Sequence, residues 1–364
     1  MPQIRLPQVL KQLKNDLIGK DSYRGVTFSY SWLANQFGHY ALGFIPALLI
    51  WIVLTKLTTW PCPVLLAPTI VSIAWLVFET GNFLGPLLLK KQSLAEHFYL
   101  PSKEKYTFQP AWKNVAFDTF TDLLFFWLGA FSASLCLAGI IGGDSKIARN
   151  VLLALMVVLI YPAAYWYRTK LYLQYAKFPI QFRLSQWKKH PQGEPLNDID
   201  VQTVLSFVEV SATSSGNHLL IFGGRRSGKS TLAIGIGTEL SIKGYSCSYY
   251  TAMKLFNTFA LNEPEIIASD DCEVWSWRTA SLLVIDDLNP GSPTPRVFLS
   301  TNDVLAAINE GDAESNRKCL AGKNVVWVLG DDDSGNPDAW LKLLLDLGVC
   351  ESKIATVGLG FVFV

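Results

Sequence analysis

The chain has 364 residues, of which 50% are apolar and 17% are charged, and its mean hydropathy is +0.26. Soluble domains average about 25% charged residues, so this composition argues against disorder, a coiled coil or an ordinary soluble enzyme. The net charge of +1 conceals two opposite parts. Residues 1–190 hold 19 Lys/Arg and 8 Asp/Glu, a net of +11, whereas the remainder carries a net of −10.

The N-terminal segment, residues 1–37, contains an amphipathic stretch at Leu6–Ile18. Its apolar residues recur at helical spacing with lysines between them, a pattern that indicates a helix with one apolar face. Two interpretations stay open. The helix lies in the membrane interface or docks on a partner, or it packs on the cytoplasmic domain of its own chain.

Four apolar runs follow and predict a transmembrane domain over residues 38–167 with a cytoplasmic loop at 90–116. The runs are His39–Thr55, Val64–Leu89, Leu123–Gly143 and Val151–Tyr167. Each has roughly the 17–25 residues that a helix needs to cross a bilayer. Aromatic residues gather at the ends of the runs, as they do at membrane interfaces. The sequence therefore predicts a bundle of four transmembrane helices.

The distribution of Lys and Arg predicts the orientation of these spans. Sixteen of these residues lie in the N-terminal segment, the long loop and the segment after the fourth span, and three lie in the other two loops. Because positive residues concentrate on the cytoplasmic side, both termini should be cytoplasmic. We expect a multi-pass protein of the plasma (inner) membrane, with anionic lipid headgroups as a partner.

Some polar residues within the spans allow a sharper interpretation. An acid inside a membrane suggests a functional site such as a proton relay, and Glu79, Asp118 and Asp122 qualify. The alternative is structural: Asp118 and Asp122 would lie in the first turn of a helix and complement its dipole. Gly81 and Gly85 form a GxxxG pattern that favours close helix packing.

Residues 168–214 form a juxtamembrane segment and linker that begins with basic and aromatic residues interleaved. Such a mixture binds nucleic acid in some proteins. Directly after a membrane span, it is more simply an anchor for lipid headgroups. We therefore interpret its aromatic residues as headgroup contacts.

A phosphate-binding motif lies between a predicted strand, His218–Phe222, and a predicted helix, Leu232–Lys243. It matches GxxxxGK[ST] in full, and the predicted nucleotide-binding residues are Gly223, Gly224, Arg225, Arg226, Ser227, Gly228, Lys229, Ser230 and Thr231. Glycines allow the backbone N–H groups to face the phosphates, and the helix N-terminus adds its positive end. Lys229 would reach the β- and γ-phosphates, and the Ser230 hydroxyl would bind Mg²⁺.

A second motif, the apolar run Leu282–Ile285 followed by Asp286 and Asp287, matches a Walker B strand. Asp286 would hold Mg²⁺ through water, and Asp287 would polarise the attacking water. The Walker motifs are too close in sequence for an ABC ATPase, and no NKxD motif of a GTPase occurs. We therefore expect ATP and Mg²⁺ as ligands.

The order of elements in residues 215–364 resembles the AAA+ and related ASCE P-loop ATPases, in particular the DnaC/IstB-like group. The expected strands are His218–Phe222, Ser246–Tyr250, Leu282–Ile285, Asn324–Leu329 and Ile354–Val364, with further helices at 198–210, Asp303–Asn309 and Pro337–Leu347. The resemblance implies an α/β P-loop NTPase domain with a mostly parallel five-stranded sheet. Asp331 is nearest to the family's sensor-1 position.

Two departures from that family affect the predicted activity. No C-terminal helical lid follows the fifth strand, and the helix before it contains no arginine finger. Arg317, or Arg296, would serve as a finger acting on a neighbouring subunit. Because such a finger contributes about 10³–10⁵ in rate, we expect slow hydrolysis that depends on a homo-oligomer or a protein partner.

Three hypotheses for function follow from the sequence. The first is a membrane-anchored cytoplasmic ATPase that drives or regulates assembly of a partner complex. The second is a nucleotide-dependent switch or scaffold with little turnover, and the third is a transporter. Nucleic acid is an unlikely partner, because the −10 charge of residues 191–364 lacks the basic footprint that phosphate backbones require.

Overall fold

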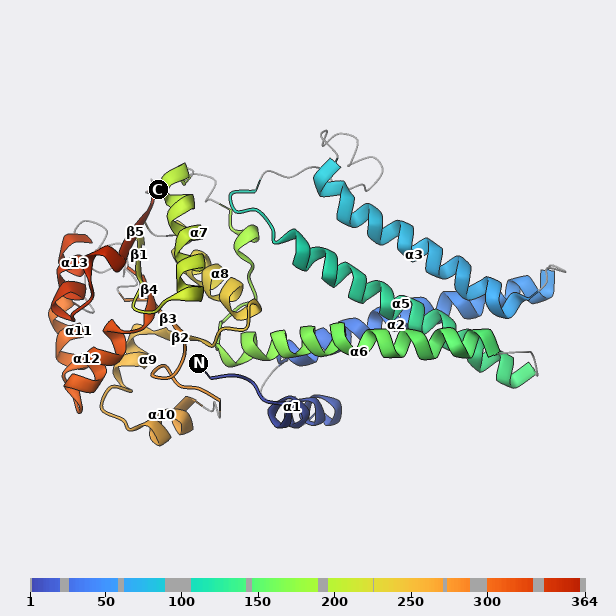
Figure 1. Ribbon diagram of the computed structural model, residues 1–364, viewed down its shortest axis with the longest axis horizontal. Coiled ribbons are helices and arrows are strands. Elements are labelled where there is room, and N and C mark those ends of the chain that lie inside the picture. Colours follow the sequence, from blue (N-terminus) through green and yellow to red (C-terminus); the bar gives the residue numbers. More distant parts are fainter. Residues whose placement is uncertain are drawn as a thin grey trace. The chain divides into compact units, whose positions relative to one another are not determined.

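The computed structural model describes residues 2–19, 26–57, 62–88, 106–141, 146–188, 196–224, 226–270, 274–288, 300–329 and 337–360 (Figure 1). The chain forms two compact units. The first, here called the sheet unit, comprises Met1–Gln12, Tyr106–Gln109 and Thr169–Val364. The second, called the helical unit, comprises Leu13–Lys105 and Pro110–Arg168.

Four long apolar helices dominate the N-terminal half of the chain. They are α2 (Phe28–Leu57), α3 (Pro63–Leu88), α5 (Trp112–Ile141) and α6 (Lys146–Tyr175). Their most apolar windows have mean hydropathies of 1.7 to 2.0. At 1.5 Å per residue, helices of 26 to 30 residues exceed the roughly 30 Å of a bilayer core. All four are long and apolar enough to cross a membrane, as the sequence predicted.

Close packing in the helical unit takes place between α2 and α5. A Cβ atom at Gly43 would collide with the backbone carbonyl of Phe126, and one at Gly129 would collide with that of Tyr40. At Gly81 a Cβ atom would meet nothing within 4 Å. Gly81 therefore makes no close contact with the described residues, and the surroundings of Gly85 lie outside them. Gly43 and Gly129, which are not part of a GxxxG pattern, bring α2 and α5 together.

The polar residues of α5 pair with α2. Asp122 Oδ1 lies 3.1 Å from Gln36 Nε2 and 3.2 Å from His39 Nδ1. Helix α5 begins at Trp112 and has no acid in its first turn, so the helix-dipole interpretation of Asp118 and Asp122 is wrong. Instead, Asp122 accepts a hydrogen bond from Gln36 and lies at ion-pair distance from His39 across a helix interface, which lowers the cost of placing a carboxylate among apolar helices.

Helix α1 (Leu6–Ile18) presents its apolar residues outward. Leu10 is 55% exposed and Leu17 is 63% exposed, whereas the polar Gln12 and Asp16 are buried. Asp16 Oδ2 accepts a 2.7 Å hydrogen bond from Tyr167 of α6. The polar side of α1 is thus the side that packs against the described residues of its own chain.

The sheet unit contains five parallel strands in the order β2-β3-β4-β1-β5. They are β1 (His218–Gly223), β2 (Cys247–Thr251), β3 (Leu282–Asp286), β4 (Asn324–Val328) and β5 (Ile354–Leu359). Every residue of β3 and β4 is buried, as expected for parallel strands covered on both faces. The predicted five-stranded parallel sheet is confirmed.

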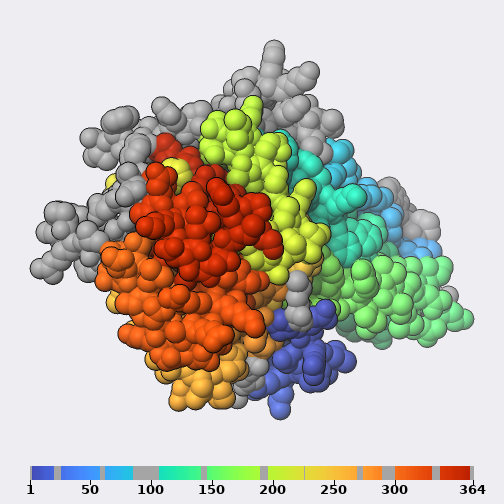
Figure 2. All heavy atoms as spheres, turned by 60° about the vertical axis from the view of Figure 1, so that its left-hand side comes forward, coloured from blue at the N-terminus to red at the C-terminus, as the bar shows by residue number. Residues whose placement is uncertain are grey.

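Helices cover both faces of this sheet (Figure 1). Helices α7 (Asp198–Thr213) and α8 (Lys229–Ile242) lie on one face. The other face is covered by α9 (Ala252–Phe256), α11 (Thr301–Ile308), α12 (Ala313–Ala321) and α13 (Pro337–Asp346), which share a core with the strands. Figure 2 shows the orange and red C-terminal helices as one continuous surface beside the yellow-green α7.

Two of the observed helices were not predicted. They are α10 (Glu263–Asp270) and α12. In α12 only Asn316 and Leu320 are buried, so the segment lacks the apolar periodicity that would reveal a helix.

The segment after α6 packs within the sheet unit. Its side chains Phe178 and Trp187, like Tyr172 near the end of α6, are 3 to 5% exposed. The carbonyl oxygen of Ala176 accepts a 2.8 Å hydrogen bond from the N–H of Tyr249 in β2. The interpretation of these aromatic residues as headgroup contacts is therefore wrong, because they fill a protein core.

Candidate functional site

The residues of both sequence motifs meet at the carboxyl edge of the sheet, where parallel α/β folds place their ligands. Strand β1 ends at Gly223, and α8 begins at Lys229 with Gly228 as its N-cap. Gly223 has φ +148°, and a Cβ atom there would collide with the carbonyl of Leu359. Gly228 has φ +92°. Both positions therefore require glycine.

Lys229 folds back over this loop. Its Nζ atom donates hydrogen bonds of 2.6 Å to the carbonyl oxygen of Gly223 and 2.8 Å to that of Gly224. The positive charge thus lies against the loop at the N-terminus of α8, where the helix dipole also favours an anion. This end of the sheet can hold a negatively charged group such as a phosphate.

Ser230 connects the loop to the acidic motif of β3. Its Oγ atom lies 3.0 Å from Asp286 Oδ1, although the two residues are 56 positions apart in sequence. Asp286 is 2% exposed, and its Oδ1 also accepts a 2.9 Å hydrogen bond from the N–H of Asp287. A hydroxyl and a carboxylate side by side are oxygen ligands of the kind that Mg²⁺ prefers.

Sequence reasoning missed Tyr249, which completes the surroundings of Asp286. Its phenol donates a 2.7 Å hydrogen bond to Asp286 Oδ2. Burial, together with the negative charge of Asp286, raises the pKa of Tyr249 above its ordinary value, so the hydroxyl remains a donor at neutral pH. The only available signal was its position near the end of β2, beside β3.

Asp287 has an unusual backbone conformation. Its φ is +55°, a left-handed value that is uncommon for residues other than glycine, asparagine and aspartate. The residue is exposed. Partial burial of the carboxyl, followed by the charge of Asp286, raises the pKa of Asp287. The turn thus presents a carboxylate to solvent directly beside the buried Asp286.

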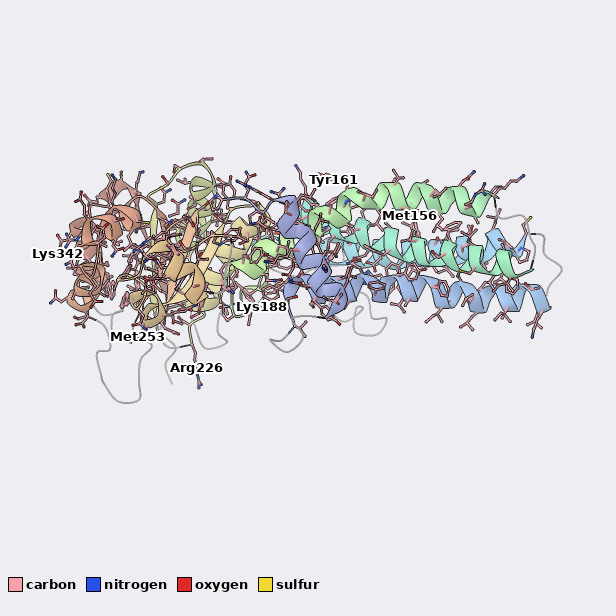
Figure 3. The ribbon with its side chains drawn as sticks, turned by 90° about the horizontal axis from the view of Figure 1, so that it is seen from below. Met156, Tyr161, Lys188, Arg226, Met253 and Lys342 are labelled. Atoms are coloured by element: carbon pink, nitrogen blue, oxygen red, sulfur yellow. The ribbon has the colours of Figure 1, made fainter. Side chains whose placement is uncertain are left out.

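The remaining predicted loop residues differ in their surroundings. Ser227 is buried, and its hydroxyl makes no hydrogen bond within the described part of the chain. The side chain of Thr231 bonds to the carbonyl oxygen of Gly228 at 2.8 Å. Arg226 is exposed and extends away from the ribbon (Figure 3). Arg225 lies outside the described residues.

The candidate arginine finger is bound elsewhere in this structure. Arg317 Nε donates a 3.0 Å hydrogen bond to Asn309, just after α11. The hydrogen bond ties its guanidinium to the turn between α11 and α12, and no hydrogen bond links it to the described residues of the loop. Arg296 and Asp331 lie outside the described residues.

The described residues contain no group of three or more His, Cys, Asp or Glu side chains that could by itself hold a metal ion. A divalent cation at Ser230 and Asp286 would therefore take further ligands from water or a phosphate group. Mg²⁺ is usually bound in this way, by one or two carboxylates with substrate phosphates. Compared with family models and with curated proteins, the chain matches none.

Proposed function

We propose that this protein is a membrane-anchored ATPase whose P-loop, residues 223–231, binds ATP with Mg²⁺ on the cytoplasmic side. The observation that carries the proposal is the 3.0 Å contact between Ser230 and Asp286. It joins the hydroxyl that follows a phosphate-binding lysine to a carboxylate at the end of a neighbouring buried strand, which is the pairing that a Mg²⁺–nucleotide site needs.

Phosphate binding would use Lys229 and the backbone N–H groups of the loop. The two carbonyl oxygens that now accept hydrogen bonds from Lys229 Nζ are weaker partners for an ammonium group than a phosphate anion, because the attraction between two opposite charges adds to the hydrogen bond. Bound ATP would therefore draw the lysine from Gly223 and Gly224 toward its phosphates.

Magnesium would be held by Ser230 and Asp286 and would offset the negative charge of the phosphates. Asp287 would act on the attacking water, and the exposed position of this residue directly after Asp286 supports that role. Its raised pKa brings it closer to the operating pH, which favours general-base catalysis.

Hydrolysis would remain slow in an isolated chain. Arg317 bonds to Asn309 and to none of the described residues of its own loop, which supports a finger supplied by a second copy or a partner. We infer that ATP turnover is tied to assembly of a complex at the membrane.

The basic residues of the first half support attachment to anionic lipid with both termini in the cytoplasm.

Equilibrium binding of Mg²⁺–ATP to the full chain in lipid nanodiscs tests the proposal. Lys229→Ala should weaken binding by about 10- to 150-fold, the equivalent of a hydrogen bond to a charged group. Lys243→Ala is the matched control, because Lys243 is an exposed residue at the other end of α8, and it should bind as the wild type does. A wild-type protein that binds ATP no better than Lys229→Ala would overturn the proposal.

The second candidate is a nucleotide switch with little turnover. It is favoured by the hydrogen bond of Arg317 to Asn309, because this arginine makes no bond to the described residues of the loop. It is distinguished by measuring phosphate release at rising protein density in proteoliposomes. An ATPase completed by a second copy should show a specific activity that rises with density and is lost in Arg317→Ala. ATP binding without phosphate release above the Lys229→Ala level would select the switch.

A further inference from the structure

Residues 176–188, here called the strap, run from the end of α6 to the predicted phosphate-binding loop. At the far end of the strap, the indole Nε1 of Trp187 donates a 3.1 Å hydrogen bond to the carbonyl oxygen of Gly228. The same carbonyl accepts from the N–H of Leu232 and the hydroxyl of Thr231. Trp187 therefore holds the residue at which the loop turns into α8.

Two glycines of α8 make room for the strap. A Cβ atom at Gly235 would lie 3.1 Å from Leu184 Cα, and one at Gly237 would lie 2.5 Å from the ring of Phe178. Glycine inside a helix costs about 1 kcal/mol relative to alanine. The close approach of the strap explains why α8 contains two of them.

An ion pair fastens the middle of the strap to the same helix. Arg183 places Nε 2.8 Å and Nη2 3.3 Å from the two carboxylate oxygens of Glu239. Both side chains are largely shielded, with exposures of 22% and 16%. A bidentate guanidinium–carboxylate pair fixes the orientation of the two side chains as well as the distance between them.

The beginning of the strap reaches the acidic side of the site. The carbonyl oxygen of Ala176 accepts from the N–H of Tyr249, and the ring of Phe178 lies edge-on to the ring of Tyr249 with 6.3 Å between centroids. Tyr249 in turn donates to Asp286. The strap thus touches both the loop that would bind phosphate and the tyrosine that orients the metal-binding acid.

We propose that the strap is a positioning element of the nucleotide site, with Trp187 as the residue that holds the loop in its binding-competent form. This inference rests on the proposed function. Because the strap continues directly from α6, a helix long and apolar enough to cross a membrane, nucleotide binding and the end of α6 are energetically coupled. Such coupling is reciprocal. The free energy by which the strap favours ATP binding equals the free energy by which bound ATP stabilises the strap.

The test compares Trp187→Phe with Trp327→Phe in the full chain. Trp187→Phe removes the hydrogen bond and keeps an aromatic ring against Phe108, whose centroid lies 5.9 Å away. Trp327 is the matched control, since it is also buried and its indole donates a 3.0 Å hydrogen bond to His218, at the start of β1 and away from the loop. Amide hydrogen exchange of residues 226–232 is measured without nucleotide, and Mg²⁺–ATP affinity is measured in parallel.

Trp187→Phe should speed exchange of these amides and weaken Mg²⁺–ATP binding by about 3- to 10-fold, the effect of one lost hydrogen bond. Trp327→Phe should leave both unchanged, even where it lowers the melting temperature equally. Wild-type exchange and affinity in Trp187→Phe would overturn the proposal. If the wild type binds no ATP, the proposed function fails by itself, and the exchange measurement still decides whether Trp187 holds the loop.

Gly237→Ala provides a second variant that leaves Trp187 intact. Its added methyl group would displace Phe178, so it should loosen the strap and weaken ATP binding in the same direction. Gly244→Ala is its control, because a Cβ atom at Gly244 would meet nothing within 4 Å, although the φ of +85° there adds some strain. Equal ATP affinity in the two glycine variants would count against the strap.

Discussion

The phenol of Tyr249, in the middle of β2, and the carboxylate of Asp286, at the end of β3, are joined by a 2.7 Å hydrogen bond. Asp286 is buried, so the phenol, Ser230 and the N–H of Asp287 together replace the water that a carboxylate would otherwise bind. This set of donors keeps a charged group stable inside the sheet unit.

Tyr249→Phe should therefore lower the stability of the sheet unit by about 1–3 kcal/mol, the cost of leaving a buried acceptor without a donor. Thermal melting of the purified protein measures the change. Tyr250→Phe alters the neighbouring residue, whose ring lies in the apolar core, and should have a smaller effect. Addition of Mg²⁺–ATP should restore more of the lost stability in Tyr249→Phe than in Tyr250→Phe. Equal recovery of stability in the two variants would refute this account.

Asp287→Asn should reduce ATP hydrolysis at least 10²-fold, the lower end of the contribution of a general base, with little change in Mg²⁺–ATP affinity. Asparagine tolerates the left-handed backbone at this position, so the variant should fold normally. Steady-state phosphate release, measured in parallel with Mg²⁺–ATP binding, tests whether hydrolysis falls while affinity is retained. Loss of binding to the same extent as hydrolysis would assign Asp287 a structural role instead.

The rate of hydrolysis should fall with acid at a higher pH than an ordinary aspartate would produce. The pKa of Asp287 is raised, so protonation removes the base before pH reaches the usual carboxyl range near 4. The pH–rate profile of the wild type measures this acid limb. A limb at or below pH 4 would show that another group controls the rate.

His218 should make the stability of the sheet unit depend on pH. Burial lowers the pKa of His218 to about 4, and its Nδ1 accepts a hydrogen bond from Trp327. The unfolded chain binds a proton near pH 6.5 and the folded chain only near pH 4, so stability is present above about pH 6.5 and is lost as pH falls between these values. The loss should reach about 3 kcal/mol. In His218→Gln, melting temperatures between pH 7 and 4.5 should change less, and an unchanged slope would exclude His218 as the cause.

The apolar face of α1 should lie in lipid. A photoreactive amino acid at position 10 or 17, both exposed, should crosslink to phospholipid in proteoliposomes. The same group at the buried position 12 should crosslink to protein, which makes it the matched control. Crosslinks to a second copy of the chain from positions 10 and 17 would instead identify α1 as a docking helix.

The sequence predicted much of the fold because strong local patterns specified it. The four apolar helices were predicted from apolar runs too long for an ordinary core. Strand β3 was predicted from four apolar residues followed by two acids. In contrast, α12 escaped prediction because it buries only two residues. The contact of Gly43 with Phe126 also escaped, since it depends on how α2 and α5 meet.

By itself, the sequence determined the two halves of the chain, their opposite charges and the motif residues 223–231, 286 and 287, because hydrophobic length and glycine spacing are local properties. Only the tertiary structure decided that Ser230 meets Asp286, that Tyr249 completes this contact and that Trp187 holds Gly228. The basic and aromatic strap has the composition of a headgroup anchor. Its aromatic residues are buried in protein because two glycines of α8 leave space for them, and such complementarity between distant segments cannot be read from either one alone.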